Sequence, residues 1–229
     1  MSSDRKIAII AGVLFITATV AGILSSVFTE PILGAPDYLI KISENENHVI
    51  IGALFVLVMG FACAGIAISL YPILRKYNEG LALGSVGFRI FEGMLWVINA
   101  IGLLLLLTLS KEFVKAGTPG ASSFQTSAIL IRAAGDWISN LVALLAWCLG
   151  ALMYYYIFYQ TKLIPRWLAA WGLIGITLTL IACALVLFHL INSGSPIQIA
   201  LFLPIALQEM VLAVWLIVKG FNSSALLLE

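Results

Sequence analysis

Six apolar runs, each long enough to cross a lipid bilayer, account for most of this 229-residue chain. They cover residues 6–28, 49–70, 81–109, 128–159, 167–190 and 197–218. A helix needs about 20 apolar residues to cross a hydrocarbon core of ~30 Å, so every run is sufficient. We therefore predict an all-α fold: a polytopic membrane protein whose six transmembrane helices form a bundle and a single domain over residues 1–229.

The composition agrees with a membrane environment and excludes several other classes. Charged residues are 10% of the chain, whereas soluble domains carry about 25%. The formal net charge of +1 argues against a protein that binds nucleic acid. Cys63, Cys148 and Cys183 each lie inside an apolar run, which is not the pattern of a disulfide framework or a metal site. The first run is too long for a signal peptide, and we expect it to be retained.

The loop cations predict an orientation. With the N-terminus in the cytoplasm, the inner loops and ends collect seven cations: Arg5, Lys6, Arg75, Lys76, Lys162, Arg166 and Lys219. The outer loops then carry only Lys41, Lys111 and Lys115. Positive residues are enriched on the cytoplasmic side, so we predict that both termini are cytoplasmic. Aromatic residues near the inner boundary, among them Tyr154, Tyr155 and Tyr156, are predicted to be interfacial anchors.

Several polar side chains interrupt the apolar runs, and such groups are costly in a membrane unless they have partners. In the third run, Arg89, Glu92, Trp96 and Asn99 follow a spacing that places them on one helical face. The fourth run contains Arg132, Asp136 and Asn140, and the sixth contains Glu209. These eight residues are the candidate ligand-binding residues of the sequence.

A rise of ~1.5 Å per residue allows the depth of each group to be estimated. Arg89, Glu92, Glu209 and Asn140 are expected in an inner polar layer. Asn99, Arg132 and Asp136 are expected in an outer layer. The two layers together contain one carboxylate more than they contain cations, and an unpaired buried carboxylate tends to hold a proton, as in proton-coupled transporters.

Three interpretations of these groups remain open at this point. The polar side chains could hold the helices together without any chemistry, with Arg89 and Glu92, or Arg132 and Asp136, as buried ion pairs. They could form a site for a small or amphipathic ligand, in a cavity between the third, fourth and sixth spans. They could also form the site of an intramembrane enzyme that modifies lipid, although no nucleophile or hydrolase motif supports this, and we lean towards a protein that is not an enzyme.

The two histidines offer a weak alternative site for a metal. His48 opens the second span and His189 closes the fifth, so both are expected at the outer boundary. With Asp136 or Glu46 they would supply three ligands, the number that a catalytic zinc site uses. No metal-binding or phosphate-binding motif is present, and we expect no cofactor, no nucleic-acid partner, and membrane lipid as the main surroundings.

Two stretches resemble a known family. Residues 159–172, with Pro165-Arg166-Trp167-Leu168 and Gly172, resemble the P-R-W-L-x-x-x-G turn of the bacterial DUF4386 family. Phe88-Arg89-Ile90-Phe91-Glu92 resembles its F-R-x-x-E element, and residues 204–221, with Glu209, Trp215-Leu216 and Lys219-Gly220-Phe221, resemble its last span. The resemblance implies a six-span protein of the bacterial inner membrane. It implies no activity and no catalytic residues.

Overall fold

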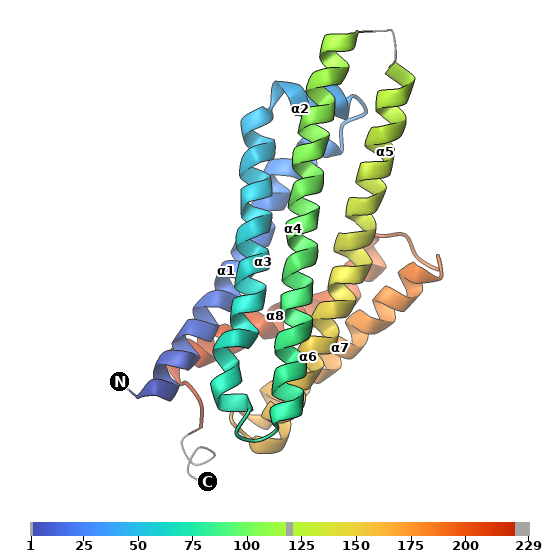
Figure 1. Cartoon of the computed structure of the whole chain (residues 1–229). Helices are drawn as coiled ribbons and strands as arrows, with labels where there is room; N and C mark the ends of the chain where they lie inside the picture. The colour runs from blue at the N-terminus through green and yellow to red at the C-terminus, as the bar shows by residue number, and fades with distance from the viewer. Residues whose placement is uncertain (1, 118–120, 223–229) are drawn as a thin grey trace.

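The computed structural model describes residues 2–117 and 121–222, and in these ranges all regular structure is helical (Figure 1). The elements are α1 (Ser3–Leu33), α2 (Tyr38–Glu44), α3 (Glu46–Leu74), α4 (Glu79–Ala116), α5 (Ala121–Trp137), the π-helical turn η1 (Ile138–Val142), α6 (Ala143–Thr161), α7 (Arg166–Leu187) and α8 (Pro196–Val218). Six helical segments are long and apolar enough to cross a membrane, with α5, η1 and α6 counting as one. The prediction of an all-α protein with six spans is confirmed.

Six helices pack in a closed ring. Five of them, α1, α3, α4, α7 and α8, are complete spans, and the sixth, α6, is the inner part of the fourth span. Around the ring, α1 contacts α3, α3 contacts α4, α4 contacts α6, α6 contacts α7, α7 contacts α8, and α8 contacts α1 again. The main hydrophobic core fills this ring and includes Phe15, Tyr155 and Phe158, all of which are buried. The inner half of the molecule is therefore a tightly packed bundle.

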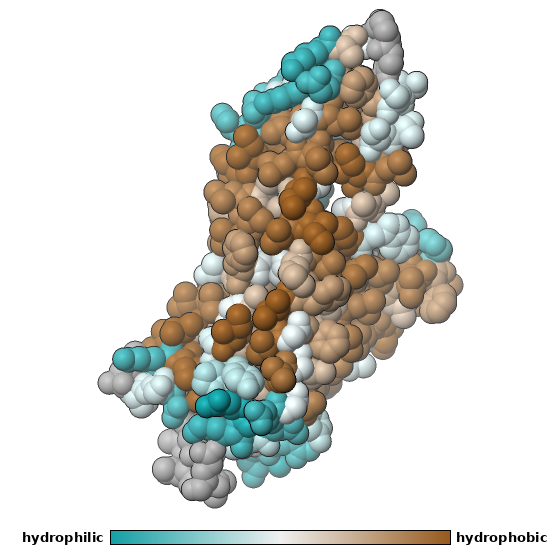
Figure 2. All heavy atoms as spheres, viewed as in Figure 1, coloured by the Kyte–Doolittle hydropathy of each residue, from teal (hydrophilic) through white to brown (hydrophobic). Residues whose placement is uncertain are grey.

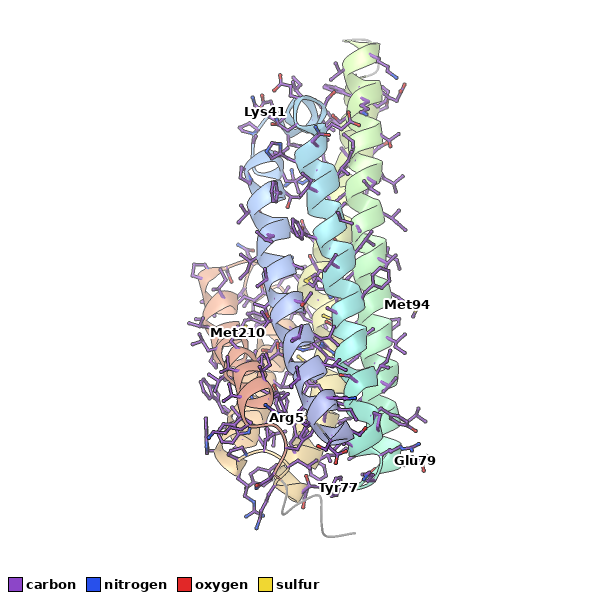
Figure 3. The ribbon with its side chains drawn as sticks, turned by 90° about the vertical axis from the view of Figure 1, so that its left-hand side faces the viewer. Arg5, Lys41, Tyr77, Glu79, Met94 and Met210 are labelled. Atoms are coloured by element: carbon purple, nitrogen blue, oxygen red, sulfur yellow. The ribbon has the colours of Figure 1, made fainter. Side chains whose placement is uncertain are left out.

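The outer half of the molecule is built differently, because the helices differ in length. α4 has 38 residues and is roughly 57 Å long, whereas α7 and α8 have 22 and 23 residues and are roughly 33–35 Å long. Figures 1 and 3 both show α4 continuing far beyond the end of the α7–α8 hairpin. α5 leaves the ring here and packs mainly against α4 and η1. The outer half thus lacks the cover that α7 and α8 give to the inner half.

The surface of the molecule follows the same stepped arrangement. Figure 2 shows a broad hydrophobic band with hydrophilic residues at its two ends, as expected for a protein surrounded by lipid. The turn between α7 and α8 lies partway up this band, and its polar residues interrupt the band there. Beside this turn Phe188 and Leu190 are 72% and 70% exposed, so they face the lipid.

Small residues allow the closest helix contacts of the ring. Gly60 of α3 and Gly93 of α4 lie against each other, and a Cβ added at Gly93 would be 2.8 Å from the carbonyl oxygen of Gly60. A Cβ added at Gly172 would be 2.4 Å from the ring of Tyr155. The hydrophobic effect does not drive helices together in lipid, because the lipid tails are as apolar as the side chains. Close van der Waals packing of this kind is therefore a main attraction between membrane helices.

The polar segment 30–47, which lies between the first two apolar runs and is therefore expected to be a loop, is mostly helical. α1 continues to Leu33, and α2 forms a short amphipathic helix whose Leu39 and Ile42 are buried. The hydroxyl of Ser110 on α4 donates a hydrogen bond to the carbonyl of Leu39. Seven residues are too few to produce a recognisable apolar run, so the sequence pattern does not predict this helix. The sequence Gly117-Thr118-Pro119-Gly120 between the third and fourth apolar runs predicts a turn. This prediction falls largely outside the described residues, since 118–120 are not described.

The start of α1 and the end of α8 lie at the same end of the bundle (Figure 1). Arg5 joins them, because its guanidinium donates hydrogen bonds to the carbonyls of Leu216, Ile217 and Val218 at distances of 3.0, 2.5 and 3.1 Å. These are carbonyls that the last turn of a helix leaves without an intrahelical partner. In Figure 3, Arg5, Tyr77 and Glu79 lie towards this end and Lys41 lies at the opposite one. That this end is cytoplasmic remains a prediction.

Candidate functional site

A buried ion pair occupies the centre of the ring. Arg89 and Glu92 of α4 are 2% and 4% exposed, and Nη1 of Arg89 lies 2.8 Å from Oε2 of Glu92. Nε of Arg89 also donates to the carbonyl of Cys63 on α3, at 3.2 Å. The i, i+3 spacing in the sequence therefore produces a pair in the structure, and the buried ion pair that the sequence suggested is present.

This ion pair is enclosed by protein. The aliphatic stem of Arg89 packs against Gly150 of α6, where an added Cβ would be 3.0 Å from its Cγ. Neither Arg89 nor Glu92 lines any of the cavities described below. A charged pair with this geometry joins α3, α4 and α6, which is the structural role that polar groups often play between membrane helices.

Glu209 of α8 lies near the ion pair but does not join it directly. Its Oε1 accepts hydrogen bonds from the indole N–H of Trp147 at 3.3 Å and from the hydroxyl of Tyr154 at 3.4 Å. It is close enough to Arg89 and Glu92 to interact electrostatically with both. Within residues 2–117 and 121–222 no cation forms an ion pair with Glu209. It is the excess carboxylate of the inner layer, held by two neutral donors from α6.

Three neighbours of Glu209 were missed or misplaced by sequence reasoning. Gln208 is completely buried: its Oε1 accepts from the hydroxyl of Tyr155 at 2.5 Å, and its Nε2 donates to the carbonyl of Leu168 at 2.9 Å. Tyr154 and Tyr155 are also completely buried, so the prediction that they are interfacial anchors is wrong, whereas Tyr156 is 48% exposed. An amide side chain next to Glu209, in an otherwise apolar helix, was the sequence signal that could have identified Gln208.

A cavity of about 470 Å³ lies in the outer half of the bundle, above the ion pair. Its wall comes from α1, α3, α4, α5, η1 and α6, with Phe202 as the contribution of α8. The polar and aromatic side chains on this wall are Ser25, Ser26, Thr29, Glu30, Trp96, Asn99, Arg132, Asp136, Ser139 and Asn140. This volume is within the range of cavities that hold small ligands, about 300–1,000 Å³. The wall differs from the expected one, because α1 and α5 supply much of it and the sixth span supplies little.

The charged groups on this wall are not paired with one another. Arg132 and Asp136 are spaced i, i+4 on α5, but no ion pair joins them, and Glu30 on α1 has none either among the described residues. The guanidinium of Arg132 instead lies over the ring of Tyr38, 4.5 Å from its centre. Within the described residues, three charged side chains therefore line the cavity without an ion partner, with Arg132 half-buried and Glu30 and Asp136 more exposed.

Asn140 lies in this outer cavity, so its predicted place in the inner layer is wrong. Its Nδ2 donates to the carbonyl of Asp136 at 3.2 Å, and its own carbonyl accepts from Nε2 of Gln198 on α8 at 3.3 Å. The depth estimate failed because α5 begins at Ala121, well before the predicted start of the span, and because η1 adds an extra residue to one turn. Such π-helical turns frequently occur at functional sites.

The cavity and the ion pair meet at Trp96. The side chain of Trp96 lines the cavity, and its indole N–H donates to Oε1 of Glu92 at 3.3 Å. One turn further along α4, Nδ2 of Asn99 donates to the carbonyl of Gly135 on α5, at 3.1 Å. The helical face of α4 that the sequence indicated thus extends from the buried ion pair of Arg89 and Glu92 to Trp96 and Asn99 on the cavity wall.

Four wall residues on α1 were missed: Ser25, Ser26, Thr29 and Glu30. The predicted span ended at residue 28, which left Thr29 and Glu30 outside it, whereas α1 continues to Leu33. Their spacing of i, i+1, i+4 and i+5 places all four on one helical face, and this pattern was the available signal.

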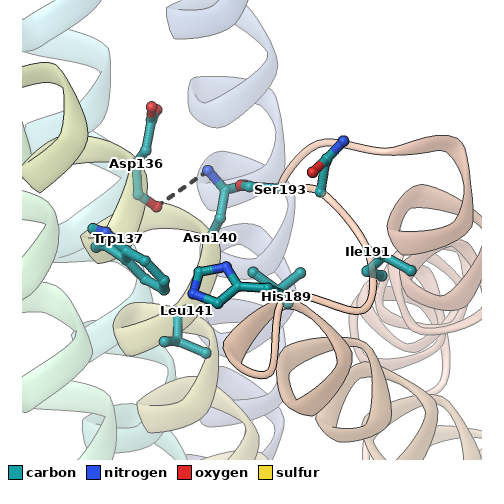
Figure 4. A pocket seen from close by; sticks show the side chains of 9 residues that line it. Asp136, Trp137, Asn140, Leu141, His189, Ile191 and Ser193 are labelled. Atoms are coloured by element: carbon teal, nitrogen blue, oxygen red, sulfur yellow. Dashed lines mark hydrogen bonds between the residues drawn. The ribbon is translucent and has the colours of Figure 1, made fainter. Parts of the chain in front are cut away.

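His48 and His189 do not form a metal site with the neighbouring carboxylates that the structure describes. The ring of His48 packs on that of Phe28, with 5.7 Å between ring centres, whereas the ring of His189 meets Trp137 edge-on at 6.0 Å. His189 lines a small side pocket of about 120 Å³ together with Asp136 and Asn140, and Figure 4 shows the Asp136 carboxylate directed away from the imidazole. In the part of the chain that the structure describes, no three His, Cys, Asp or Glu residues are grouped to hold an ion.

Comparisons with known proteins place the chain in a family without adding an activity. No curated protein and no solved structure matches it. The family model of DUF4386, a domain of unknown function, matches residues 10–220, which is most of the chain. The six apolar helices, the buried Arg89–Glu92 pair and this match together identify the chain as a member of the DUF4386 family of multi-pass membrane proteins.

Proposed function

We propose that this protein binds an amphipathic ligand in the outer cavity, with the polar part of the ligand among Asn99, Arg132, Asp136 and Asn140. The observation that carries the proposal is the set of unpaired charges on the cavity wall. Unpaired charges at membrane depth are costly and are retained mainly at ligand or ion sites. We also propose that the protein resides in the bacterial cytoplasmic membrane, with both termini in the cytoplasm.

The apolar part of the wall supports a ligand that also has a hydrophobic segment. Leu33, Leu103, Leu106, Ile131 and Phe202 line the cavity beside the polar residues. The α7–α8 hairpin ends below the outer parts of α4 and α5 (Figures 1 and 3). The wall residues Glu30 and Asp136 are exposed, which supports access of lipid to the cavity from the side. A ligand drawn from the outer half of the bilayer would place its polar group in the cavity and leave its tail against these side chains.

Two other functions have less support from the structure. A purely structural subunit is supported by the Arg89–Glu92 ion pair, which is buried and enclosed, but that role does not account for the unpaired groups around the outer cavity. A lipid-modifying enzyme would require a nucleophile or a metal beside the carboxylates. The hydroxyl of Ser139 on the wall donates to the carbonyl of Gly135, which is ordinary helix bonding and does not activate a nucleophile.

Photolabelling in vesicles tests the proposal. The purified protein would be reconstituted with a trace of phospholipid that carries a diazirine in one acyl chain, as an equal mixture of ethanolamine and glycerol head groups. Gly135→Trp fills the cavity, because Gly135 lies on its wall. Leu130→Trp is the matched control, since Leu130 is on the same helix and 65% exposed to lipid.

We expect strong labelling of peptides around Leu103 and Phe202 in the original protein and in Leu130→Trp, and a several-fold loss in Gly135→Trp. Size-exclusion chromatography in detergent would verify that each variant is folded. Labelling of these peptides that is equal in both tryptophan variants would overturn the proposal.

A further inference from the structure

The charges on the cavity wall have opposite signs, and this carries an inference about the ligand that rests on the proposed function. Arg132 supplies one positive charge, while Asp136 and Glu30 supply two negative charges, and no ion pair joins these groups among the residues that the structure describes. A simple anion would be attracted by the guanidinium but repelled by both carboxylates. A simple cation would be attracted by both carboxylates but repelled by the guanidinium. A ligand with both charges would satisfy all three groups.

The hydrogen-bonding groups on the wall indicate which kind of cation the ligand carries. Asn99 and Asn140 use their amide N–H groups on the carbonyls of Gly135 and Asp136, so their side-chain oxygens remain free to accept. Two carboxylates and two amide oxygens form a wall rich in acceptors. A primary ammonium has three N–H donors for such a wall, whereas a quaternary ammonium has none and is usually bound by a cage of aromatic rings.

The anionic part of the ligand would contact Arg132. Tyr38 holds the guanidinium from the outer side through its ring, so the planar group has a defined place in the cavity without using its N–H donors. Arginine binds phosphate through parallel N–H···O bonds, with geometric specificity. Arg132 lies nearer the outer end of α5 than Asp136, which is one helical turn further in on the same helix.

We infer that the cavity recognises a zwitterionic head group in which a phosphodiester lies next to a primary ammonium, the phosphate on Arg132 and the ammonium on Asp136 and Glu30. The apolar wall residues make the ligand a membrane lipid of the phosphatidylethanolamine type rather than a soluble compound.

Separate probes for each head group test this inference. The diazirine lipids used above would be applied one at a time, with ethanolamine, glycerol or choline as the head group. Labelling of the cavity peptides is expected to be several-fold stronger with ethanolamine than with the other two. The double variant Glu30→Gln/Asp136→Asn should remove the advantage of ethanolamine over glycerol, while Glu112→Gln, a surface control beside Lys115, should retain it.

Variants of Arg132 provide a second test of the inference. Arg132→Gln should lower the labelling by all three lipids, and Arg132→Lys, which keeps the charge, should restore part of it. Free phosphoethanolamine added in excess separates the lipid from a soluble zwitterion: unchanged labelling supports the lipid, and abolished labelling assigns the site to the soluble compound.

The outcomes separate the inference from the proposal on which it depends. If Gly135→Trp protects the cavity from all three lipids equally and no head group is preferred, the amphiphile site stands and the zwitterion inference fails. If Gly135→Trp protects the cavity from none of them, the amphiphile site itself fails.

Discussion

Arg132 and Asp136 lie one helical turn apart on α5, yet their charges are not paired, and the guanidinium of Arg132 stacks on Tyr38 instead. Arg89 and Glu92, at a similar spacing on α4, form a closed ion pair. An arginine and a carboxylate are thus paired in the inner half of the bundle and unpaired in the outer half. The inner ion pair is buried and joins helices, whereas the outer groups line a cavity. This contrast is the main reason for assigning ligand binding to the outer half.

The ion pair should be strongly coupled. Removing one partner leaves the other charge buried alone, and such changes typically cost about 3–5 kcal/mol. Arg89→Met and Glu92→Leu should each destabilise the protein in this range, while the double variant should lose clearly less than the sum of the two. Unfolding in detergent with increasing denaturant would measure all three. Additive losses would show that the two residues are not coupled.

Trp96 connects the cavity to the ion pair, so its indole N–H should contribute to stability. Trp96→Phe removes the donor to Glu92, and hydrogen bonds to charged groups are worth about 1.5–3 kcal/mol. We expect a lower unfolding temperature for this variant. The control is Trp167→Phe, because Trp167 is 55% exposed near the inner boundary. Equal unfolding temperatures for the two variants would contradict the assigned contact.

Arg5 should hold the end of α8 in place. Its three hydrogen bonds satisfy carbonyls of the last turn, so Arg5→Ala should open that turn. Hydrogen–deuterium exchange followed by mass spectrometry should show faster exchange over residues 212–219. Lys6→Ala changes an exposed cation next to it and should leave exchange unchanged. Identical exchange in both variants would mean that the arginine does not stabilise the helix end.

Gly172 should not tolerate a methyl group. An alanine Cβ there would lie 2.4–2.8 Å from three atoms of the Tyr155 ring, and overpacking of this kind costs about 1–3 kcal/mol. Gly87→Ala is the matched control, because it is also helical and has open space around its Cβ. Thermal unfolding should show a loss for Gly172→Ala and none for Gly87→Ala. The reverse order would argue against the packing of α6 on α7.

The sequence predicted the six spans because a long apolar run has few other stable forms in lipid. It also indicated the Arg89–Glu92 pair, since residues three apart on one helix are neighbours. It could not predict α2, which is too short to give a hydrophobic pattern, or the cavity face of α1, which crosses the boundary that the apolar run suggested. Depths counted from apolar boundaries misplaced Asn140, because the helices extend beyond those boundaries.

The unpaired state of Arg132 and Asp136 also lay beyond the sequence. Their i, i+4 spacing is compatible with a pair, and only the position of Tyr38, more than 90 residues away along the chain, decides where the guanidinium lies. The expected excess carboxylate is Glu209, and its partners Trp147 and Tyr154 are likewise distant in sequence.

The central claim is that the outer cavity is occupied by a ligand while the inner polar cluster is closed. A crystal structure of the protein grown from a lipid phase tests it most directly. The account predicts elongated non-protein density in the cavity, with its polar end in contact with Arg132, and none beside Arg89, Glu92 or Glu209. A cavity filled by side chains, or density beside the inner ion pair instead, would contradict it.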